Sequence, residues 1–287
     1  AADICASAAT TCAHPQSPIL SSPEDAMELS RISACTYPIR TEPLDHIFSV
    51  FSTAGYKKLD LWGGPPNYAS DPSECDIDAM RELAESYGLL IANLGTYGGR
   101  TLADNGLDAE LAILQHDIDN AVALGSRSIR VSPGHGEDAD IEELIPFFSQ
   151  AAEYAAEKGI YLGMENHNGS IACDPAAVMP LVEAVDSPYF GILYEPANLM
   201  ACRVPYKEAY RTFRGHVVHA HVKDSRWIGD TYERTMLGEG DVDIRWVVET
   251  LEADGYDGDY ALEFEIEKKV PIEQGLPTWL EYFQRIE

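Results

Sequence analysis

The chain has 287 residues, of which 48 are Asp or Glu and 20 are Lys or Arg, so that its formal charge at pH 7 is −28. A polyanion of this strength is repelled by phosphate backbones and by anionic lipid, which disfavours nucleic-acid and membrane binding. Hydrophobic residues make up 45% of the chain, and its length suits a single α/β barrel domain of about 250 residues.

From residue 31 onward, short apolar runs alternate with longer segments of helical period. The predicted strands are 31–37, 58–62, 89–94, 128–132, 160–166, 190–195, 216–223 and 259–265. The predicted helices lie at about 43–54, 76–87, 107–124, 139–158, 174–185, 205–213, 243–254 and 273–285. Gly125 and Gly159 each follow a predicted helix, where a left-handed C-cap is favoured, and Asp174 and Asp243 suit helix starts.

Eight strands alternating with eight helices predict a parallel sheet closed into a (β/α)8 TIM barrel. An open doubly wound sheet is the alternative, but no G-x-G-x-x-G motif follows the first strand to support a dinucleotide site. We therefore expect one barrel domain over residues 30–287. Residues 1–29 are expected to form an N-terminal extension packed outside or across the barrel.

The six cysteines form no C-x-x-C pair and no Cys/His cluster with zinc-finger spacing. Cys35 and Cys173 are interpreted as small buried hydrophobic residues, whereas a pairing of Cys5 with Cys12 stays open. No apolar run approaches the roughly 20 residues of a membrane span, and residues 1–29 lack a hydrophobic signal segment. We expect a cytoplasmic protein.

Polar residues on the last four predicted strands fall on one face, because side chains alternate along a strand. The alternate, apolar residues belong under the helices, so this polar face points into the barrel near its C-terminal mouth, where barrel enzymes carry their chemistry. Glu165, Glu195, His221 and Glu263 lie at similar heights on successive strands. Three converging carboxylates would repel one another unless a cation lay between them. The pattern predicts a divalent metal site, with separately solvated loop-edge residues as the alternative.

Five segments are similar to those of a known superfamily: Met164-Glu165-Asn166-His167, Tyr194-Glu195-Pro196-Ala197-Asn198, His219-Ala220-His221-Val222-Lys223-Asp224, Leu237–Asp243 and Leu262-Glu263-Phe264-Glu265. With these segments in this order, the chain over about 31–285 resembles the xylose-isomerase-like barrels. That superfamily includes ketose 3-epimerases, inosose dehydratases, hydroxypyruvate isomerases and relatives among C-glycoside deglycosidases. The resemblance implies that Glu165, Glu195, His221 and Glu263 hold one metal ion.

Two positions depart from the pattern of the superfamily. It usually has Asp where this chain has Glu195, and the ketose 3-epimerases carry a substrate-binding His where this chain has Asn198. The mostly oxygen ligand shell favours Mn²⁺, with Mg²⁺, Co²⁺ or Zn²⁺ as alternatives.

Several further residues are candidates for substrate contact, each with a structural role as an equal or stronger alternative. They are Trp62, His135, His167, Asn198, Lys223 and Arg226. Desolvation beside a cation is expected to lower the pKa of Lys223, unless the residue forms a buried ion pair with Asp224 or Glu265. His219, one layer deeper than His221, is expected to support the ligands rather than bind metal.

These features predict a metal-dependent isomerase or epimerase that acts on a neutral carbohydrate or polyol through an enediolate. Glu165 and Glu263 would be the catalytic residues, one removing a proton and the other returning it. The same enolising site suits a lyase or dehydratase, and a noncatalytic sugar-binding subunit or an abasic-site endonuclease is less favoured. We expect a homo-oligomer, or a hetero-oligomer with a small subunit.

Overall fold

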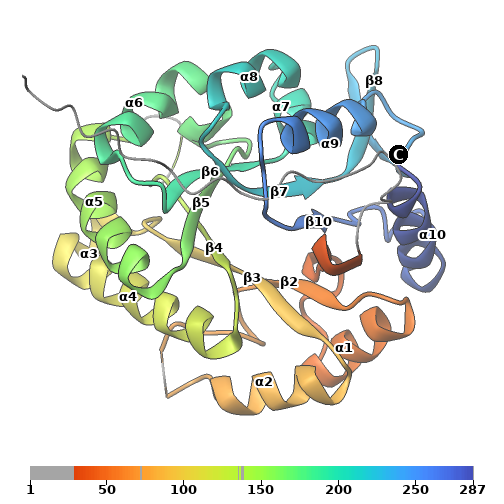
Figure 1. Cartoon of the computed structure of the whole chain (residues 1–287), viewed down its shortest axis with the longest axis horizontal. Helices are drawn as coiled ribbons and strands as arrows, with labels where there is room; N and C mark the ends of the chain where they lie inside the picture. The colour runs from red at the N-terminus through yellow and green to blue at the C-terminus, as the bar shows by residue number, and fades with distance from the viewer. Residues whose placement is uncertain (1–28, 72, 135, 137–138, 287) are drawn as a thin grey trace, which may run out of the picture.

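A computed structural model describes residues 29–71, 73–134, 136 and 139–286. Eight parallel strands close into a barrel in the order β1-β10-β7-β6-β5-β4-β3-β2, and helices surround it (Figure 1). The predicted barrel is therefore confirmed. The expected N-terminal extension, residues 1–29, lies outside the described residues except for its last position, and so does His135.

All eight predicted barrel strands are present. They are β1 Ile32–Cys35, β2 Lys58–Trp62, β3 Leu90–Gly98, β4 Ser128–Val131, β5 Tyr161–Glu165, β6 Phe190–Tyr194, β7 Val217–Val222 and β10 Tyr260–Leu262. β3 runs four residues beyond its predicted end at Leu94, and its pairing with both neighbouring strands shifts register.

The eight predicted helices are also present, with ends shifted by up to two residues. They are α1 Leu44–Thr53, α2 Ile77–Ser86, α4 Leu107–Leu124, α5 Ile141–Lys158, α6 Pro175–Val185, α8 Tyr206–Phe213, α9 Ile244–Ala253 and α10 Ile272–Gln284. Two short helices, α3 Leu102–Asn105 and α7 Pro196–Ala201, were not predicted. The side chains of Asp174 and Asp243 cap α6 and α9, and Gly125 and Gly159 adopt left-handed conformations at the ends of α4 and α5.

The hydrophobic core lies between the strands and the helix layer. Phe148 of α5 packs on Phe190 of β6, with ring centroids 4.7 Å apart. Tyr194 of β6 packs in the same way against Tyr210 and Phe213 of α8. Because these outward-facing strand residues are covered by helices, the alternate residues of each strand face the barrel interior, as the sequence pattern predicts.

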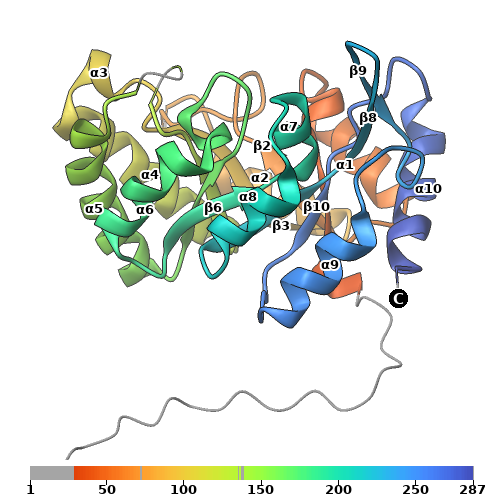
Figure 2. The same ribbon diagram turned by 90° about the horizontal axis from the view of Figure 1, so that it is seen from above.

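An antiparallel hairpin that the sequence pattern did not indicate follows β7 directly. It consists of β8 Asp224–Ile228 and β9 Thr231–Thr235. Figure 2 shows the hairpin and α3 at the same end of the barrel. Since α3 follows the C-terminal end of β3, the hairpin stands at the end where the polar strand residues emerge.

A disulfide bond joins Cys173 to Cys202, which are 29 positions apart in the sequence. The interpretation of Cys173 as a small buried hydrophobic residue was therefore incomplete, because its sulfur is covalently bonded. The bond links η3 (Ile171–Cys173), which follows β5, to the residue that ends α7 after β6. Cys35 is buried and unbonded, as expected, whereas Cys5 and Cys12 lie outside the described residues.

Among the described residues, no helix has the length and apolar character that crossing a membrane requires. A cytoplasmic location stays a prediction, and disulfide bonds in general are typical of oxidising compartments.

Candidate metal centre and active site

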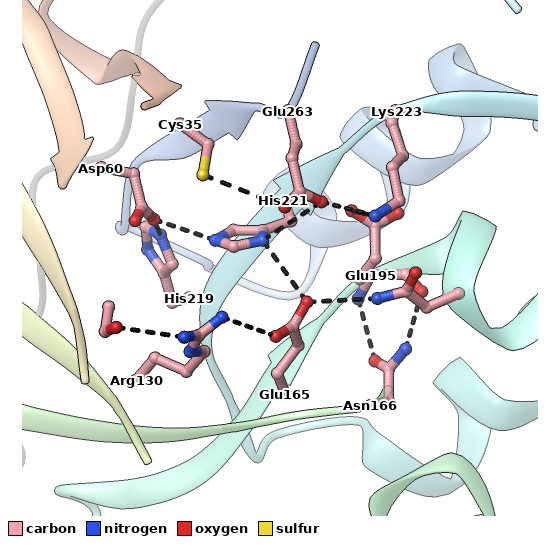
Figure 3. A network of polar contacts seen from close by, with 12 residues as sticks. Cys35, Asp60, Arg130, Glu165, Asn166, Glu195, His219, His221, Lys223 and Glu263 are labelled. Atoms are coloured by element: carbon pink, nitrogen blue, oxygen red, sulfur yellow. Dashed lines mark hydrogen bonds and ion pairs between the residues drawn. The ribbon is translucent and has the colours of Figure 1, made fainter. Parts of the chain in front are cut away.

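Three buried side chains from different strands meet inside the mouth of the barrel. The Nδ1 atom of His221 in β7 lies 3.8 Å from Oε1 of Glu165, the last residue of β5, and 3.8 Å from Oε2 of Glu263, which follows β10. All three side chains are at most 8% exposed. Figure 3 shows the imidazole between the two carboxylates. The structure thus brings together three of the four predicted ligands.

The orientation of the His221 ring is set by Asp60 in β2. Oδ2 of Asp60 accepts hydrogen bonds from Nε2 of His221 and Nε2 of His219, both at 2.9 Å, and from Nδ2 of Asn93 at 3.0 Å. Burial alone would raise the pKa of Asp60, but the two histidines hold it well below its usual range. Because the Nε2–H of His221 donates to Asp60, its Nδ1 atom faces the glutamates. A ligating histidine is commonly held in this way.

Asp60, His219 and His221 also form a compact His/Asp group of their own. Nε2 of each histidine is already hydrogen-bonded to Oδ2 of Asp60 at 2.9 Å, so we interpret this group as a positioning network. The supporting role expected of His219 is consistent with this arrangement, although the contact passes through Asp60.

Glu195 is fully buried next to this cluster, but its free oxygen is turned toward Lys223. Its Oε1 atom accepts the backbone N–H of Ala197 at 3.0 Å and so caps the start of α7, whereas Oε2 lies 4.0 Å from Nζ of Lys223. Burial raises the pKa of Glu195 to about 8, because the attraction of Lys223 only partly offsets burial and the charge of Glu263. Its role as a fourth metal ligand stays a prediction.

The residues present fit a divalent cation. Nδ1 of His221 and Oε2 of Glu195 are buried and have no hydrogen-bond partner among the described residues. An unpaired buried polar atom costs free energy, so two such atoms beside two carboxylates suit a bound ion. The cluster of Glu165, His221 and Glu263 supplies one imidazole nitrogen and carboxylate oxygens, which Mn²⁺, Mg²⁺, Co²⁺ and Zn²⁺ all accept.

Glu165 is held by two side chains. Its Oε2 atom accepts from Nη1 of Arg130 in β4 at 3.1 Å, and its Oε1 atom accepts from Nδ2 of Asn198 in α7 at 3.1 Å. Burial would raise the pKa of Glu165, but Arg130 and His221 outweigh it and hold the pKa at about 2. Arg130 was not singled out from the sequence, although alternation from Ser128 places it on the inward face of β4.

Lys223 forms a buried ion-pair network. Its Nζ atom lies 2.5 Å from Oε2 of Glu263 and 2.8 Å from Oε2 of Glu265. Burial would lower the pKa of Lys223, but the surrounding glutamates raise it well above its usual value. The expectation of a lowered pKa referred to Lys223 beside a bound cation and stays a prediction, whereas the alternative of a buried ion pair with Glu265 is confirmed.

Asp224, the other alternative partner of Lys223, instead organises a loop. Its carboxylate accepts the backbone N–H groups of Ser225, Gly238, Gly240 and Val242. Gly240 approaches so closely that a Cβ atom there would lie 2.1 Å from Oδ1 of Asp224. The segment Leu237–Asp243 is therefore folded around one buried carboxylate.

The mouth of the barrel contains a cavity of about 710 Å³, lined by both glutamates of the cluster, His167 and Lys223. Asn198 contacts Glu165, and Trp62 donates its Nε1–H to the hydroxyl of Tyr97, which lines the cavity. Arg226 pairs with Glu233 across the hairpin and does not line this cavity. The predicted role of His135 falls outside the described residues.

The sequence pattern of the xylose isomerase-like TIM barrel family matches residues 48–286. The chain belongs to this family. This xylose isomerase-like barrel is 23% identical over 231 residues to a fructoselysine 3-epimerase from Shigella flexneri, a match that covers 75% of this chain and 83% of that protein. It is 28% identical over 188 residues to a 3-oxo-isoapionate decarboxylase from Pectobacterium atrosepticum, covering 62% of each chain.

Among solved structures, this xylose isomerase-like barrel is similar to a xylose isomerase-like TIM barrel protein from Mycobacterium smegmatis in complex with magnesium. The TM-score is 0.74 at 17% identity, and the match covers 89% of this chain and 96% of that one. At this identity the similarity shows the shared fold.

Proposed function

We propose that this protein is a divalent-metal-dependent sugar isomerase or epimerase. The proposal rests on one observation: an imidazole nitrogen without a hydrogen-bond partner lies 3.8 Å from each of two buried carboxylates at the mouth of a TIM barrel. The relative named as fructoselysine 3-epimerase supports the class of reaction. The magnesium bound by the similar barrel supports a divalent ion, for which Mn²⁺ is our first choice.

Glu165, His221 and Glu263 would hold the ion, with Glu195 as a fourth ligand once its carboxyl group has lost its proton. When bound, the ion supplies Lewis-acid polarisation of a substrate carbonyl, which makes the neighbouring C–H more acidic and stabilises an enediolate.

The two glutamates are placed to move that proton. Both line the cavity, and they come from β5 and β10, which are not neighbours in the barrel. One carboxylate removes a proton from carbon, and the other returns a proton to the same or the adjacent carbon. Arg130 and Asn198 orient Glu165, and Lys223 orients Glu263, so the positions of both carboxylates are set before substrate binds.

Elimination is the second candidate, because the same enolised substrate can lose a β-substituent. Lys223, a protonated ammonium group in the cavity wall, is placed to donate a proton to a leaving oxygen. The relative named as a 3-oxo-isoapionate decarboxylase supports lyase chemistry in a similar chain, although decarboxylation differs from loss of a β-substituent.

Proton transfer to carbon is tested directly by incubating the Mn²⁺-loaded protein in D₂O with a panel of ketoses, inososes and 3-oxo-glycosides. We expect deuterium at C1, C2 or C3 of one class, whereas release of water or aglycone would favour elimination. Glu263→Gln and Glu165→Gln should each abolish exchange. Glu239→Gln, an identical change at an exposed position outside the cavity lining, is the matched control. Exchange that survives Glu263→Gln would exclude the mechanism.

A further inference from the structure

The cavity at the mouth of the barrel has the opposite charge balance from the chain as a whole. Six basic and four acidic side chains line it. The basic ones are Arg40, Arg100, Arg130, Lys223, Arg234 and Lys268. The whole chain has only 20 basic residues against 48 acidic ones. Almost a third of its cations therefore surround one cavity, and a divalent ion at the glutamate cluster would add further positive charge.

Three of the six cations are neutralised within the site. Arg130 pairs with Glu165, while Lys223 and Arg234 both pair with Glu265. Arg40, Arg100 and Lys268 differ, because none has an ion-pair partner in the part of the chain that the structure describes. We call these three residues the unpaired cations.

Two of the unpaired cations are held in place by aromatic rings. The guanidinium group of Arg40 lies 3.9 Å from the ring centre of Tyr37, and its Nη1 atom donates to the carbonyl oxygen of Tyr37 at 3.0 Å. Arg100 lies 5.3 Å from the ring centre of Tyr97. Trp62 connects the two rings, since it packs edge-on against Tyr37 and donates to the hydroxyl of Tyr97.

A cation–π contact restrains a guanidinium group without using all of its N–H donors, which leaves donors for a further partner. A planar array of donors with little freedom to lose is well suited to a carboxylate or a phosphate. The aromatic residues therefore present ordered positive charge to the cavity.

Two of the unpaired cations, Arg40 and Arg100, follow strands that carry no member of the metal cluster. Arg40 and Arg100 follow β1 and β3, whereas Lys268 follows β10, as Glu263 of the cluster also does. Glu165 and His221 come from β5 and β7. The glutamates and the unpaired cations line one cavity, so the far end of a substrate whose reacting carbons lie between the glutamates would meet these cations there.

We propose that the substrate is an anionic sugar derivative whose carboxylate or phosphate group is bound by Arg40, Arg100 and Lys268. This inference rests on the proposed function for the placement of the reacting carbons. The expectation of a neutral substrate drew on the net charge of the whole chain, whereas binding depends on the charges around the cavity, where basic side chains outnumber acidic ones.

Binding of three unreactive compounds tests the proposal: glucitol, gluconate and glucitol 6-phosphate. Gluconate differs from glucitol by a carboxylate at one end, and the phosphate ester by a dianion there. Calorimetry with the full chain at constant Mg²⁺ should show about tenfold tighter binding of at least one anion than of glucitol. The tighter of the two anions identifies the group that the site accepts.

Variants locate the effect. Arg40→Met and Arg100→Met keep an apolar side chain on each ring and should together lower anion affinity about tenfold without changing glucitol affinity. Arg40→Lys, which keeps the charge, should retain part of the anion affinity that Arg40→Met loses. Arg245→Met, the same loss of charge on the exposed face of α9, is the matched control. Equal affinity for all three compounds, no detectable binding, or anion affinity unchanged in the double variant would overturn the proposal.

The outcome is separable from that of the proposed function, because none of the three compounds carries a ketone or reacts. The D₂O panel is extended for this purpose to ketose phosphates and keto sugar acids, and anion preference without deuterium exchange in any of them would count against the isomerase and retain the anion site. Deuterium exchange confined to neutral ketoses, without anion preference, would retain the isomerase and overturn the anion site.

Discussion

The side-chain amide of Asn198 donates a hydrogen bond of 3.1 Å to the Oε1 atom of Glu165. In the ketose 3-epimerases that the chain resembles, this position carries a substrate-binding histidine. Here the residue instead contacts a proposed catalytic carboxylate, so its first role is to position Glu165. Both residues are buried, which makes the contact more valuable than it would be in water.

Replacing Asn198 should therefore affect stability and turnover together. Asn198→Ala leaves a buried carboxylate oxygen with one partner fewer, and we expect a loss of about 2 kcal/mol in the free energy of unfolding and about tenfold in turnover. Denaturant unfolding and steady-state kinetics measure the two effects. Asn105→Ala is the matched control, because that exposed amide also donates to a glutamate, Glu110, and neither residue lines the cavity. An Asn198→Ala variant with full turnover would exclude the positioning role.

Asp60→Asn should weaken metal binding even though Asp60 does not belong to the cluster of glutamates. The change removes the charged acceptor that fixes the ring of His221, and losing such a partner typically lowers metal affinity 10–100-fold. Calorimetric titration with Mn²⁺ measures it. Asp117→Asn, at another buried aspartate that accepts from Tyr68, should change stability alone. Equal metal affinities in the two variants would show that His221 is oriented without Asp60.

Metal affinity should rise with pH. In the metal-free protein, burial opposes but Asp60 and the glutamates raise the pKa of His221 to about 9, and burial raises that of Glu195 to about 8. Both groups must release a proton to bind an ion, so affinity should increase between pH 6.5 and 8.5, with nearly two protons released per ion at pH 6.5 and fewer as pH rises. Calorimetry in buffers of different ionisation enthalpy counts these protons. Glu195→Gln should lower the count by one, and an unchanged count would remove Glu195 from the ligand set.

The stability of the metal-free protein should fall as pH rises, whereas its metal affinity increases. The unfolded chain releases the protons of Glu195 and His221 near their ordinary pKa values of 4.5 and 6.5, whereas the folded chain retains them to about 8 and 9. The stabilisation from each group is complete below the unfolded value and is lost as pH rises through the folded one. Thermal unfolding between pH 6 and 9.5 should show a falling Tm. Saturating Mn²⁺ should reduce this fall, because the ion binds the deprotonated groups.

The disulfide bond should contribute measurably to stability. Closing a loop with a sequence separation of 29 corresponds to about 3.5 kcal/mol in the chain-entropy description. Cys173→Ser combined with Cys202→Ser should lower the free energy of unfolding by up to that amount, and dithiothreitol should lower it only in the unsubstituted protein. A reductant effect of equal size in the double variant would assign the loss to something other than this bond.

Most of the barrel could be predicted from the sequence, because its strands and helices have different periods of hydrophobicity. Alternation along the predicted strand 216–223 placed His219, His221 and Lys223 on the inner face. The structure confirms this placement, because both histidines contact Asp60 and Lys223 contacts Glu263 inside the barrel. The hairpin of β8 and β9 was missed because it follows β7 without an intervening turn signal and is half exposed, so it lacks a strong apolar pattern.

The partners within the site were harder to predict, because they depend on which side chains meet across the barrel. Alternation along β2 puts Asp60 on the same face as Trp62, but only the closed barrel shows that Asp60 contacts β7. Arg130 could have been found by the same alternation in β4. The direction in which the pKa of Lys223 shifts could not be predicted, because it depends on how many carboxylates surround the ammonium group in the fold.

The loop folded around Asp224 limits what sequence similarity to this chain can say about substrate. The segment Leu237–Asp243, in which this chain resembles other barrels, supplies backbone N–H groups to Asp224 and leaves no room for a Cβ atom at position 240. None of the residues in that segment lines the cavity. A chain that shares the segment therefore shares a loop shape, and its substrate must be inferred from positions such as Arg40 and Arg100.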